Sequence, residues 1–398
     1  MPTLRRIPAS IWALGFVSLL MDVSSELIHS LLPVFMVAEL GASVLTIGLI
    51  EGAAEATALI VKVFSGTISD YLGKRKPLAV LGYALGAISK PMFALAGTPG
   101  MVLSARLIDR VGKGIRGAPR DALVADLVAP EMRGAAFGLR QSLDTVGAFL
   151  GPLLGMLLML AWANDFHSIF LVAVIPAFLA VALLFFGVQE PERPQIAGAR
   201  RVNPIRMTNL RQLSAAYWRV VGIGAVFTLA RFSEAFLVLR AMQGGLPIAW
   251  TPLVLIAMNV VYALAAYPFG KLADHKPHRR LLAWGLLLLI GADLLLALGN
   301  HWSLVWSGLT LWGLHMAMTQ GLLATMVANT APTELRGTAY GFFNLVSGIA
   351  MLAASVIAGL LWDRYGASFT FIASLTFAAL ALAAVMWRSH ETNTALPV

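Results

Sequence analysis

One short pattern occurs twice in this chain, about half a chain length apart, and this internal repeat constrains the fold more than any other feature. The first copy places Gly66 and Asp70 before three consecutive cations. The second places Gly270 and Asp274 before another cationic cluster. Nearly the same offset separates two further matching segments, residues 129–138 and 331–341. A chain that repeats itself once at half its length is most simply built from two similar halves.

The composition is that of a membrane protein. The 398 residues are 59% hydrophobic and only 12% charged, whereas a soluble domain carries about 25% charged residues. The apolar stretches are long enough to cross a bilayer of roughly 30 Å as helices of about 20 residues. The first stretch follows Arg5 and Arg6 directly, so we expect a transmembrane helix there and not a cleaved signal peptide. Two repeated halves in a membrane favour a two-lobed transporter.

Twelve transmembrane helices are predicted, which makes the chain an all-α membrane protein of two pseudo-symmetric six-helix bundles. The predicted spans are residues 9–37, 44–69, 77–97, 101–124, 134–162, 167–187, 218–242, 250–273, 280–299, 302–328, 337–361 and 367–387. Most cations then fall on one side, at Arg5, Arg6, Lys74, Arg75, Lys76, Arg133, Lys276, Arg279, Arg280, Arg336 and Arg388. The positive-inside rule places both termini in the cytoplasm, and we expect the cytoplasmic (inner) membrane of a prokaryote. It also accounts for the net charge of +9, so no nucleic-acid partner is expected.

The longest polar stretch lies midway between the repeated motifs. Residues 189–217 interrupt the hydropathy and are rich in arginine, so we interpret them as a cytoplasmic linker. They divide an amino-terminal six-helix bundle, residues 1–188, from a carboxy-terminal one, residues 218–398. The chain has no cysteine, which excludes disulfides and thiolate metal sites. No metal or cofactor is expected.

The first copy of the repeat resembles the loop signature of the major facilitator superfamily, and the resemblance covers the whole chain. The matching residues, between the second and third predicted spans, are Gly66, Asp70, Gly73, Lys74 and Arg75. The loop departs from the family pattern at Tyr71, where an arginine is usual. In the fourth span Arg106, Gly112 and Gly114 resemble the family's arginine-glycine signature, with Arg110 where glycine is common. The resemblance implies transport by rocking of two bundles around a central site.

The resemblance also implies a gate on the cytoplasmic side. Asp70 ends a predicted helix beside a short cationic loop, where it can accept charge-assisted hydrogen bonds and latch the two bundles together. Gly73 permits the tight turn that follows. The predicted gating residues are Gly66, Asp70, Gly73, Lys74, Arg75, Asp126, Glu131, Arg133, Asp274, Glu334 and Arg336.

The fifth predicted span resembles the signature of the antiporter branches of the family. The matching residues are Gly147, Gly151, Pro152 and Gly155. The three glycines recur every four residues and give the helix a smooth face for close packing, and Pro152 is expected to kink it. Antiport and plain helix packing remain alternative explanations of this motif.

Ionisable residues inside the predicted spans are candidates for the transport site, because each charge costs at least about 2.5–3.5 kcal/mol in hydrocarbon. The candidates for proton coupling and for the substrate cavity are Asp22, Glu26, Glu51, Glu55, Arg106, Arg110, Arg231 and Glu234. Asp22 and Glu26 have no cation on their own helix, so we favour them as proton carriers. Glu26 is slightly preferred, because Ser25-Glu26 recurs as Ser233-Glu234.

Other charged residues in the spans have structural explanations. Arg140 and Asp144 are four residues apart and are expected to neutralise each other on one helix face. Glu51 and Glu55 either pair with cations of the same bundle or take part in transport, and both remain open. Asp293 is expected at the periphery, against a neighbouring helix or near the lipid.

These observations predict a secondary active transporter and not an enzyme. The sequence contains no Gly-x-x-x-x-Gly-Lys-Ser/Thr loop for ATP and no catalytic constellation. We expect a monomer that exports a small molecule or ion in exchange for protons. One alternative is a proton-coupled uptake symporter for an anionic solute, because the predicted interior is rich in cations. Another is a membrane sensor or assembly factor that kept the fold without transport.

Overall fold

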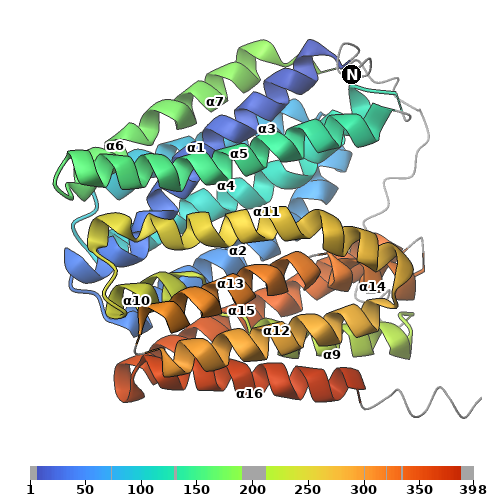
Figure 1. Cartoon of the computed structure of the whole chain (residues 1–398). Helices are drawn as coiled ribbons and strands as arrows, with labels where there is room; N and C mark the ends of the chain where they lie inside the picture. Colours follow the sequence, from blue (N-terminus) through green and yellow to red (C-terminus); the bar gives the residue numbers. More distant parts are fainter. Residues whose placement is uncertain are drawn as a thin grey trace, which may run out of the picture. The chain divides into compact units, whose positions relative to one another are not determined.

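The computed structural model of this chain describes residues 7–72, 74–129, 132–190, 212–299, 301–319, 321–332 and 335–386. All regular secondary structure in these residues is helical (Figure 1), which confirms the predicted all-α class. The chain divides into two compact units. Unit 1 comprises Met1–Gly41, Ala53–Pro204 and Ile248–Leu253, and unit 2 comprises Ala42–Gly52, Ile205–Pro247 and Val254–Val398.

Unit 1 contains most of α2 and six further α-helices. They are α1 (Ala9–Ala38), α2 (Val44–Leu72), α3 (Lys76–Ala94), α4 (Pro99–Asp126), α5 (Arg133–Ala161), α6 (Phe166–Val172) and α7 (Val174–Gly187), with the short 3₁₀ helix η3 (Ile248–Trp250). The side chain of Thr98 caps α4 by accepting the backbone N–H of Met101, a group that has no partner inside the helix. The most extensive packing joins α1 to α5 and α3 to α4.

Unit 2 contains the first residues of α2 and eight further helices. They are α9 (Ala215–Leu229), α10 (Ala235–Gln243), α11 (Pro252–His275), α12 (His278–Leu298), α13 (Trp302–Thr319), α14 (Leu322–Thr330), α15 (Arg336–Tyr365) and α16 (Ala367–Met386). α12 packs against α13 and α16, and α16 also packs against α9 and α15. These contacts bury Leu289, Ala292 and Leu296 of α12 completely.

Nine helical stretches among the described residues are long and apolar enough to cross a membrane. Their ends lie close to the predicted ones; α1, for example, covers Ala9–Ala38 where the sequence predicts residues 9–37. The other three predicted spans are also helical but differ in character. α4 carries many charged side chains, and the seventh and tenth spans are each divided into two helices. The prediction of twelve spans is consistent with these helices.

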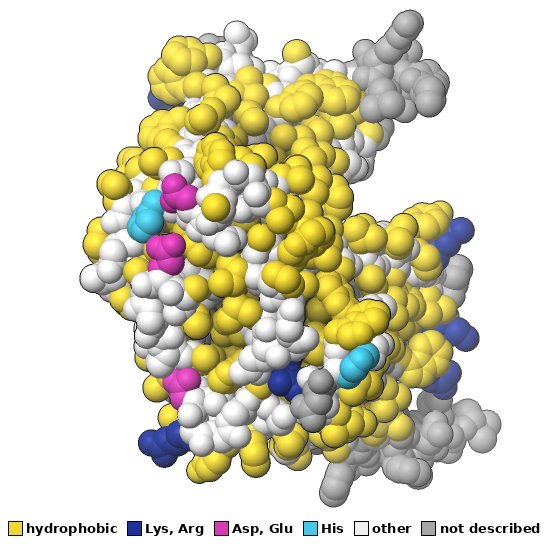
Figure 2. All heavy atoms as spheres, turned by 60° about the vertical axis from the view of Figure 1, so that its left-hand side comes forward, with side chains coloured by type: hydrophobic (Ala, Val, Ile, Leu, Met, Phe, Trp, Pro, Cys, Tyr) yellow, Lys and Arg dark blue, Asp and Glu magenta, His cyan; other side chains and the backbone are white. Residues whose placement is uncertain are grey.

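The surface of the protein is strongly apolar. On the face drawn in Figure 2, hydrophobic side chains cover most of the described surface and charged side chains occur in few places. Phe186, Leu264 and Tyr267 are among the most exposed large side chains, at 81%, 75% and 72%. Such apolar surface is unusual on a soluble monomer, whereas helices in a bilayer face lipid tails, so the surface fits the predicted membrane location.

The seventh predicted span, residues 218–242, is not one continuous helix. α9 ends at Leu229 and α10 begins at Ala235. Ser233 offers a physical reason, because its side chain accepts the backbone N–H of Ala235 at 3.3 Å and so competes with helical hydrogen bonding. The prediction of one helix is therefore wrong here, and Arg231 and Glu234 lie at the break between α9 and α10.

The predicted linker, residues 189–217, is described in part. Residues 191–211 lie outside the described part of the chain. α9 already begins at Ala215, where the hydroxyl of Ser214 caps it by accepting the backbone N–H of Tyr217 at 3.2 Å.

Candidate functional site: a cluster of charges inside unit 1

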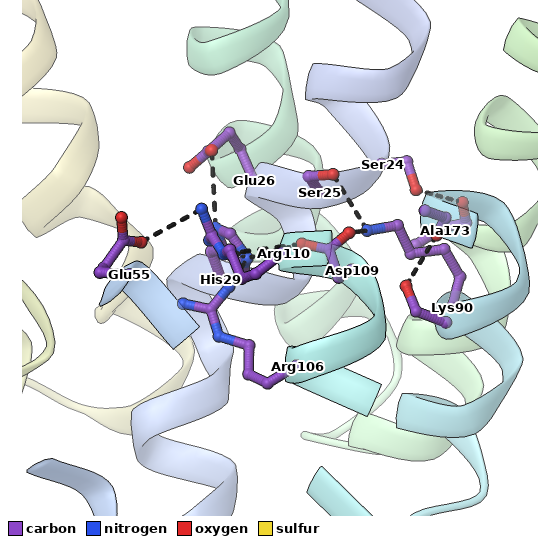
Figure 3. Close-up of polar contacts among 12 residues, drawn as sticks. Ser24, Ser25, Glu26, His29, Glu55, Lys90, Arg106, Asp109, Arg110 and Ala173 are labelled. Carbon is purple, nitrogen blue, oxygen red and sulfur yellow. Dashed lines mark hydrogen bonds and ion pairs between the residues drawn. The ribbon is translucent and has the colours of Figure 1, made fainter. Parts of the chain in front are cut away.

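Four helices of unit 1 bring charged side chains together in the interior (Figure 3). This charge cluster consists of Glu26 and His29 of α1, Glu55 of α2, Lys90 of α3, and Arg106, Asp109 and Arg110 of α4. Lys90, Asp109 and Arg110 are buried most deeply, with 0%, 1% and 2% of their surface exposed. Burying charges is costly unless each one is paired, so the pairing decides what each residue can do.

Asp109 lies at the centre of the charge cluster. Its Oδ1 accepts a hydrogen bond from Nζ of Lys90 at 2.8 Å, and its Oδ2 lies 3.7 Å from Nε of Arg110. Lys90 also donates to the hydroxyl of Ser25 at 3.0 Å. Because Asp109 faces two buried cations, it is suited to holding α3 and α4 together rather than to exchanging a proton.

His29 lies between two arginines and a glutamate. Nη2 of Arg110 is 2.7 Å from Nε2 of His29, and Arg106 contacts the same nitrogen. A guanidinium only donates hydrogen bonds, so Nε2 must carry a lone pair and the ring must be neutral. Nδ1 lies 3.6 Å from Oε1 of Glu26 and 3.1 Å from Nη2 of Arg110. His29 thus joins the acidic face of α1 to the arginines of α4.

Glu55 reaches the charge cluster from α2. Its Oε1 lies 3.1 Å from Nη1 of Arg110, and its side chain is 36% exposed against 2% for that arginine. Glu55 therefore pairs with a cation of its own bundle. With its ion pairs formed and His29 neutral, the cluster balances three cations against three carboxylates: Lys90, Arg106 and Arg110 against Glu26, Glu55 and Asp109. A proton taken up by one carboxylate would leave one positive charge in excess.

Asp22 lies one helical turn before Glu26 on α1, and its surroundings differ from those of the charge cluster. It makes no side-chain hydrogen bond or ion pair with any residue that the structure describes. Its charged neighbours are two carboxylates and two cations, Asp144, Glu26, Arg116 and Lys113. A carboxyl group without a fixed partner can change its charge without breaking an ion pair, which a proton carrier must do.

Two glycines of α5 pack directly on α1 beside these acidic residues. A Cβ atom on Gly147 would lie 2.9 Å from Cβ of Asp22, and one on Gly151 would lie 2.9 Å from Cβ of Glu26. Carbon atoms in contact prefer about 3.5–4.0 Å. Gly155 leaves more room, since its nearest neighbours would be 3.5 Å away. The glycine motif therefore brings α5 into direct contact with α1 at Asp22 and Glu26.

Gly151→Ala is expected to push α5 away from α1 and to destabilise the protein by about 1–3 kcal/mol, the usual range for overpacking. Gly155→Ala is the matched control, because its added methyl group meets atoms at ordinary contact distance. The higher helix propensity of alanine, up to about 1 kcal/mol, should leave the control at least as stable as the original chain. Thermal melting of the two purified variants checks this. Equal melting temperatures would contradict a tight α1–α5 contact.

α5 also contains the pair that the sequence predicts on one helix face. Arg140 donates through Nη1 to Oδ2 of Asp144, four residues further on, which confirms that prediction. Arg140 also lies near Asp121 of α4, with 3.9 Å between Nε and Oδ1. Pro152 is buried inside the same helix.

Three predicted site residues belong to unit 2. Glu51 is buried, with 5% of its surface exposed, in the first part of α2. Arg231 lies in the break after α9, with its guanidinium 5.8 Å from the centre of the Phe227 ring, and Glu234 is the N-cap of α10. Asp293 is wholly buried in α12. It packs against Ser374 of the neighbouring helix α16, which is one of the two expected alternatives, but it is buried and not peripheral.

The predicted cytoplasmic gate is described in part. Outside the described part of the chain lie Gly73, Glu131 and Glu334, together with the side chains of Asp70 and Asp274, whereas Gly66 lies in α2. In unit 1, Nε of Arg75 donates to Oδ2 of Asp126 at 2.9 Å, so two predicted gating residues form an ion pair. The remaining members are exposed: Lys74, Arg133 and Arg336.

Glu190 joins this region although it is not among the predicted gating residues. Its carboxylate accepts the backbone N–H groups of Arg75 and Lys76, the second at 3.3 Å. Both groups lie at the start of α3, where the helix dipole favours a negative charge. The available signal was its place as the first acidic residue after the sixth predicted span.

A family model of the Major Facilitator Superfamily matches residues 14–355 of this chain, and also residues 248–397. An uncharacterised MFS-type transporter of Methanocaldococcus jannaschii is 32% identical over 369 residues, which cover 90% of this chain and 89% of the relative. The quinolone resistance protein NorA of Staphylococcus aureus is 24% identical over 362 residues, which cover 89% of this chain and 90% of NorA.

The fold of the chain is also similar to solved structures. A bacterial homolog of the human lysosomal transporter Spinster, in an inward-facing and occupied conformation, matches with a TM-score of 0.78 at 16% sequence identity. The match covers 96% of each chain. At this identity the likeness concerns the fold alone, and it agrees with the predicted helical transporter fold.

Proposed function

The chain belongs to the Major Facilitator Superfamily, and we propose that it is a proton-coupled exporter, an antiporter that moves a small solute out of the cell as protons enter. Two six-helix bundles, joined by the linker at residues 189–217, rock around a central site in the cytoplasmic membrane, with both termini in the cytoplasm. The protein acts as a monomer. The predicted gating residues hold the cytoplasmic side closed in one half of the cycle.

The observation that carries this proposal is the lone carboxyl group of Asp22. Other carboxylates of unit 1 have a cation at close range: Asp109 meets Lys90, Glu55 meets Arg110, and Asp144 meets Arg140. Asp22 meets none of the described cations within ion-pair distance and packs on a glycine of α5. It can therefore gain or lose a proton without leaving a buried cation unpaired, and this makes it our first choice as the proton carrier.

Glu26 connects Asp22 to the charge cluster. Its side chain is 26% exposed, and its contact with the cluster is the 3.6 Å approach to Nδ1 of His29. A proton on Glu26 would change the charge that faces the imidazole of His29, and both arginines of the cluster contact the same ring. Proton uptake by Glu26 on α1 would in this way alter the contacts of Arg106 and Arg110 on α4. Coupling of transport to protons requires that proton binding shifts the equilibrium between two conformations, and a shift of α4 relative to α1 would meet this requirement.

Export has two supports. The glycine motif of α5, which resembles that of antiporter branches, contacts α1 at both candidate proton carriers. The relative NorA is named for quinolone resistance, a phenotype that export of the drug would produce. Quinolones are therefore the first substrates to test.

The direction of flux tests this function. Purified protein is first screened by thermal shift against quinolones and organic anions at two pH values, and the most stabilising solute is used for transport. We expect that solute to accumulate in everted membrane vesicles with an acidic lumen, beyond the level in vesicles without the protein, and to leak out when a protonophore collapses the gradient. Accumulation in right-side-out vesicles with acid outside would instead show uptake. Absence of gradient-dependent flux in both preparations would favour a sensor or assembly factor.

The second candidate function is uptake of an anionic solute with protons. The charge balance of the cluster favours it, because three cations face three carboxylates and one bound proton leaves a positive charge in excess. An anion would then bind only the protonated site. The same vesicle experiment separates this function from export.

A further inference from the structure

Unit 2 holds a buried carboxyl group that plays no part in the proposed transport site. Asp293 lies in the second half of α12 with none of its surface exposed. Its Oδ1 has no hydrogen-bond partner among the described residues. Its Oδ2 lies 2.5 Å from Oγ of Ser374 on α16. A buried charge without a partner is rare in a membrane-spanning helix, so the charge of this group needs an explanation.

The hydroxyl group of Ser374 makes two short contacts at once. Its Oγ lies 2.6 Å from the carbonyl oxygen of Ala230 and 2.5 Å from the carboxyl group of Asp293. A serine hydroxyl carries one proton, and a carbonyl oxygen can only accept. If the serine proton goes to Ala230, the proton in the other contact must come from Asp293. The geometry is then a relay in which the carboxyl O–H donates to serine and serine donates to the backbone.

An ionised Asp293 fits the same geometry poorly. Ser374 would have to turn its proton to the carboxylate, and two oxygen lone pairs would then face each other across 2.6 Å at Ala230. The buried carbonyl group would lose its donor, and the carboxylate would keep one donor for two oxygens. Both changes leave polar groups unsatisfied in a low-dielectric interior.

The charged groups around Asp293 do not neutralise it. On α13, Nδ1 of His315 donates to the carbonyl of Gly285, two turns of α12 away. On α10, Nε of Arg240 donates to the carbonyl of Leu296. α16 carries no ionisable side chain along its length, and the two at the break are Arg231 and Glu234. Within the described residues none of these forms an ion pair with Asp293.

The relay stabilises the break in the seventh span through the carbonyl group of Ala230. Ala230 follows the last residue of α9, at the break in the seventh span. In a continuous helix its carbonyl would accept the backbone N–H four residues later, from Glu234. The break removes that donor, and Ser374 supplies another from α16. The relay therefore fastens the broken end of α9 to α12 and α16.

We propose that Asp293, Ser374 and the Ala230 carbonyl form a buried proton-binding site in unit 2, in which a protonated Asp293 holds the break between α9 and α10 in place. Loss of the proton turns the serine hydroxyl to the carboxylate and releases the Ala230 carbonyl. The site does not depend on the proposed transport function, because its proton is detected in the resting protein. Failure of transport and failure of this proposal are thus separate results.

Infrared spectroscopy of the full-length protein in lipid tests the proposal, because a protonated carboxyl group absorbs apart from a carboxylate. We expect the difference between wild type and Asp293→Asn at neutral pH to show one buried carboxylic-acid band in the wild type. The asparagine amide can still donate to Ser374, so the variant should fold and melt at or above the wild-type temperature. A carboxylate band in that difference would overturn the proposal.

Two serine variants keep the test decisive if Asp293→Asn does not fold. Ser374→Ala removes the acceptor of the carboxyl proton, so the carboxylic-acid band should shift to higher frequency, as expected for a weaker hydrogen bond. Ser374→Thr keeps a hydroxyl group and serves as the matched control, with an unshifted band. An identical carboxyl region in wild type and Ser374→Ala would show that the relay does not exist.

Discussion

Asp22→Asn is expected to abolish the response of transport to a pH gradient while the protein still folds and binds its solute. The amide keeps the shape of the carboxyl group and much of its hydrogen bonding, but it cannot alternate between charged and neutral forms. Because Asp22 has no ion-pair partner among the described residues, its neutralisation leaves no buried cation unpaired. The melting temperature should therefore change little. Glu26→Gln is expected to act in the same direction.

Flux into everted vesicles, measured with and without a gradient, checks this expectation beside a melting curve for each variant. Asp144→Asn is the matched control, since it removes a carboxylate from the neighbouring α5 that is bonded to Arg140. This control should lose stability, because it deprives a buried guanidinium of its closest partner. If Asp22→Asn and Glu26→Gln both keep the full gradient response, the proton carrier lies elsewhere, and Glu234→Gln, with Glu51 and Glu55, comes next. An unfolded Asp22→Asn would point to a structural role.

Helix positions could be predicted from the sequence because they follow from desolvation. A helix of about 20 apolar residues is more stable in a bilayer than in water and is long enough to span it. The polar residues that end each apolar run mark where the helix leaves the membrane. The first span shows this well: its predicted end at residue 37 and the observed end at Ala38 differ by one residue. Hydropathy averages over many residues, so it locates such long elements with small error.

The break in the seventh span was not predictable by the same means. Residues 218–242 are apolar enough to form one helix, and averaging hides the local competition at Ser233, whose side chain bonds the backbone of Ala235. The glycine motif of α5 was also predictable only in part. Its spacing predicted a packing face, but only the fold shows that the face lies against Asp22 and Glu26.

Which charged side chains form ion pairs could not be predicted from the sequence either. Asp22 and Asp109 are both aspartates inside predicted spans, yet one has no ion-pair partner among the described residues and the other lies between two cations. Lys90 is 19 residues from Asp109 along the chain, on a different helix, and no local periodicity relates them. Which helix faces meet is a property of tertiary packing, so neither the charge cluster nor the relay at Asp293 could be assembled in advance.

Asp109→Leu is expected to destabilise unit 1 by about 3–5 kcal/mol, because it leaves the buried ammonium of Lys90 without a counter-ion. Ser25 would then be its remaining polar contact. Lys90→Met should cost less, since Asp109 keeps Arg110 at 3.7 Å. The double variant Asp109→Leu/Lys90→Met should recover most of the loss, because removing both buried charges avoids their desolvation. Arg110 keeps Glu55 as a partner in every case.

Equilibrium stability of the four proteins gives the coupling energy between the two side chains. Glu55→Gln is the control and should cost less stability than Asp109→Leu, because its carboxylate is 36% exposed and Arg110 keeps the carboxylate of Asp109 at 3.7 Å. If the double variant is as unstable as Asp109→Leu alone, the loss comes from packing and not from an orphaned charge. A stable double variant that no longer transports would place the pair in the transport cycle as well as in the structure. A stable double variant that transports normally would show that the pair only holds α3 and α4 together, and the proton-coupling role would rest on α1 alone.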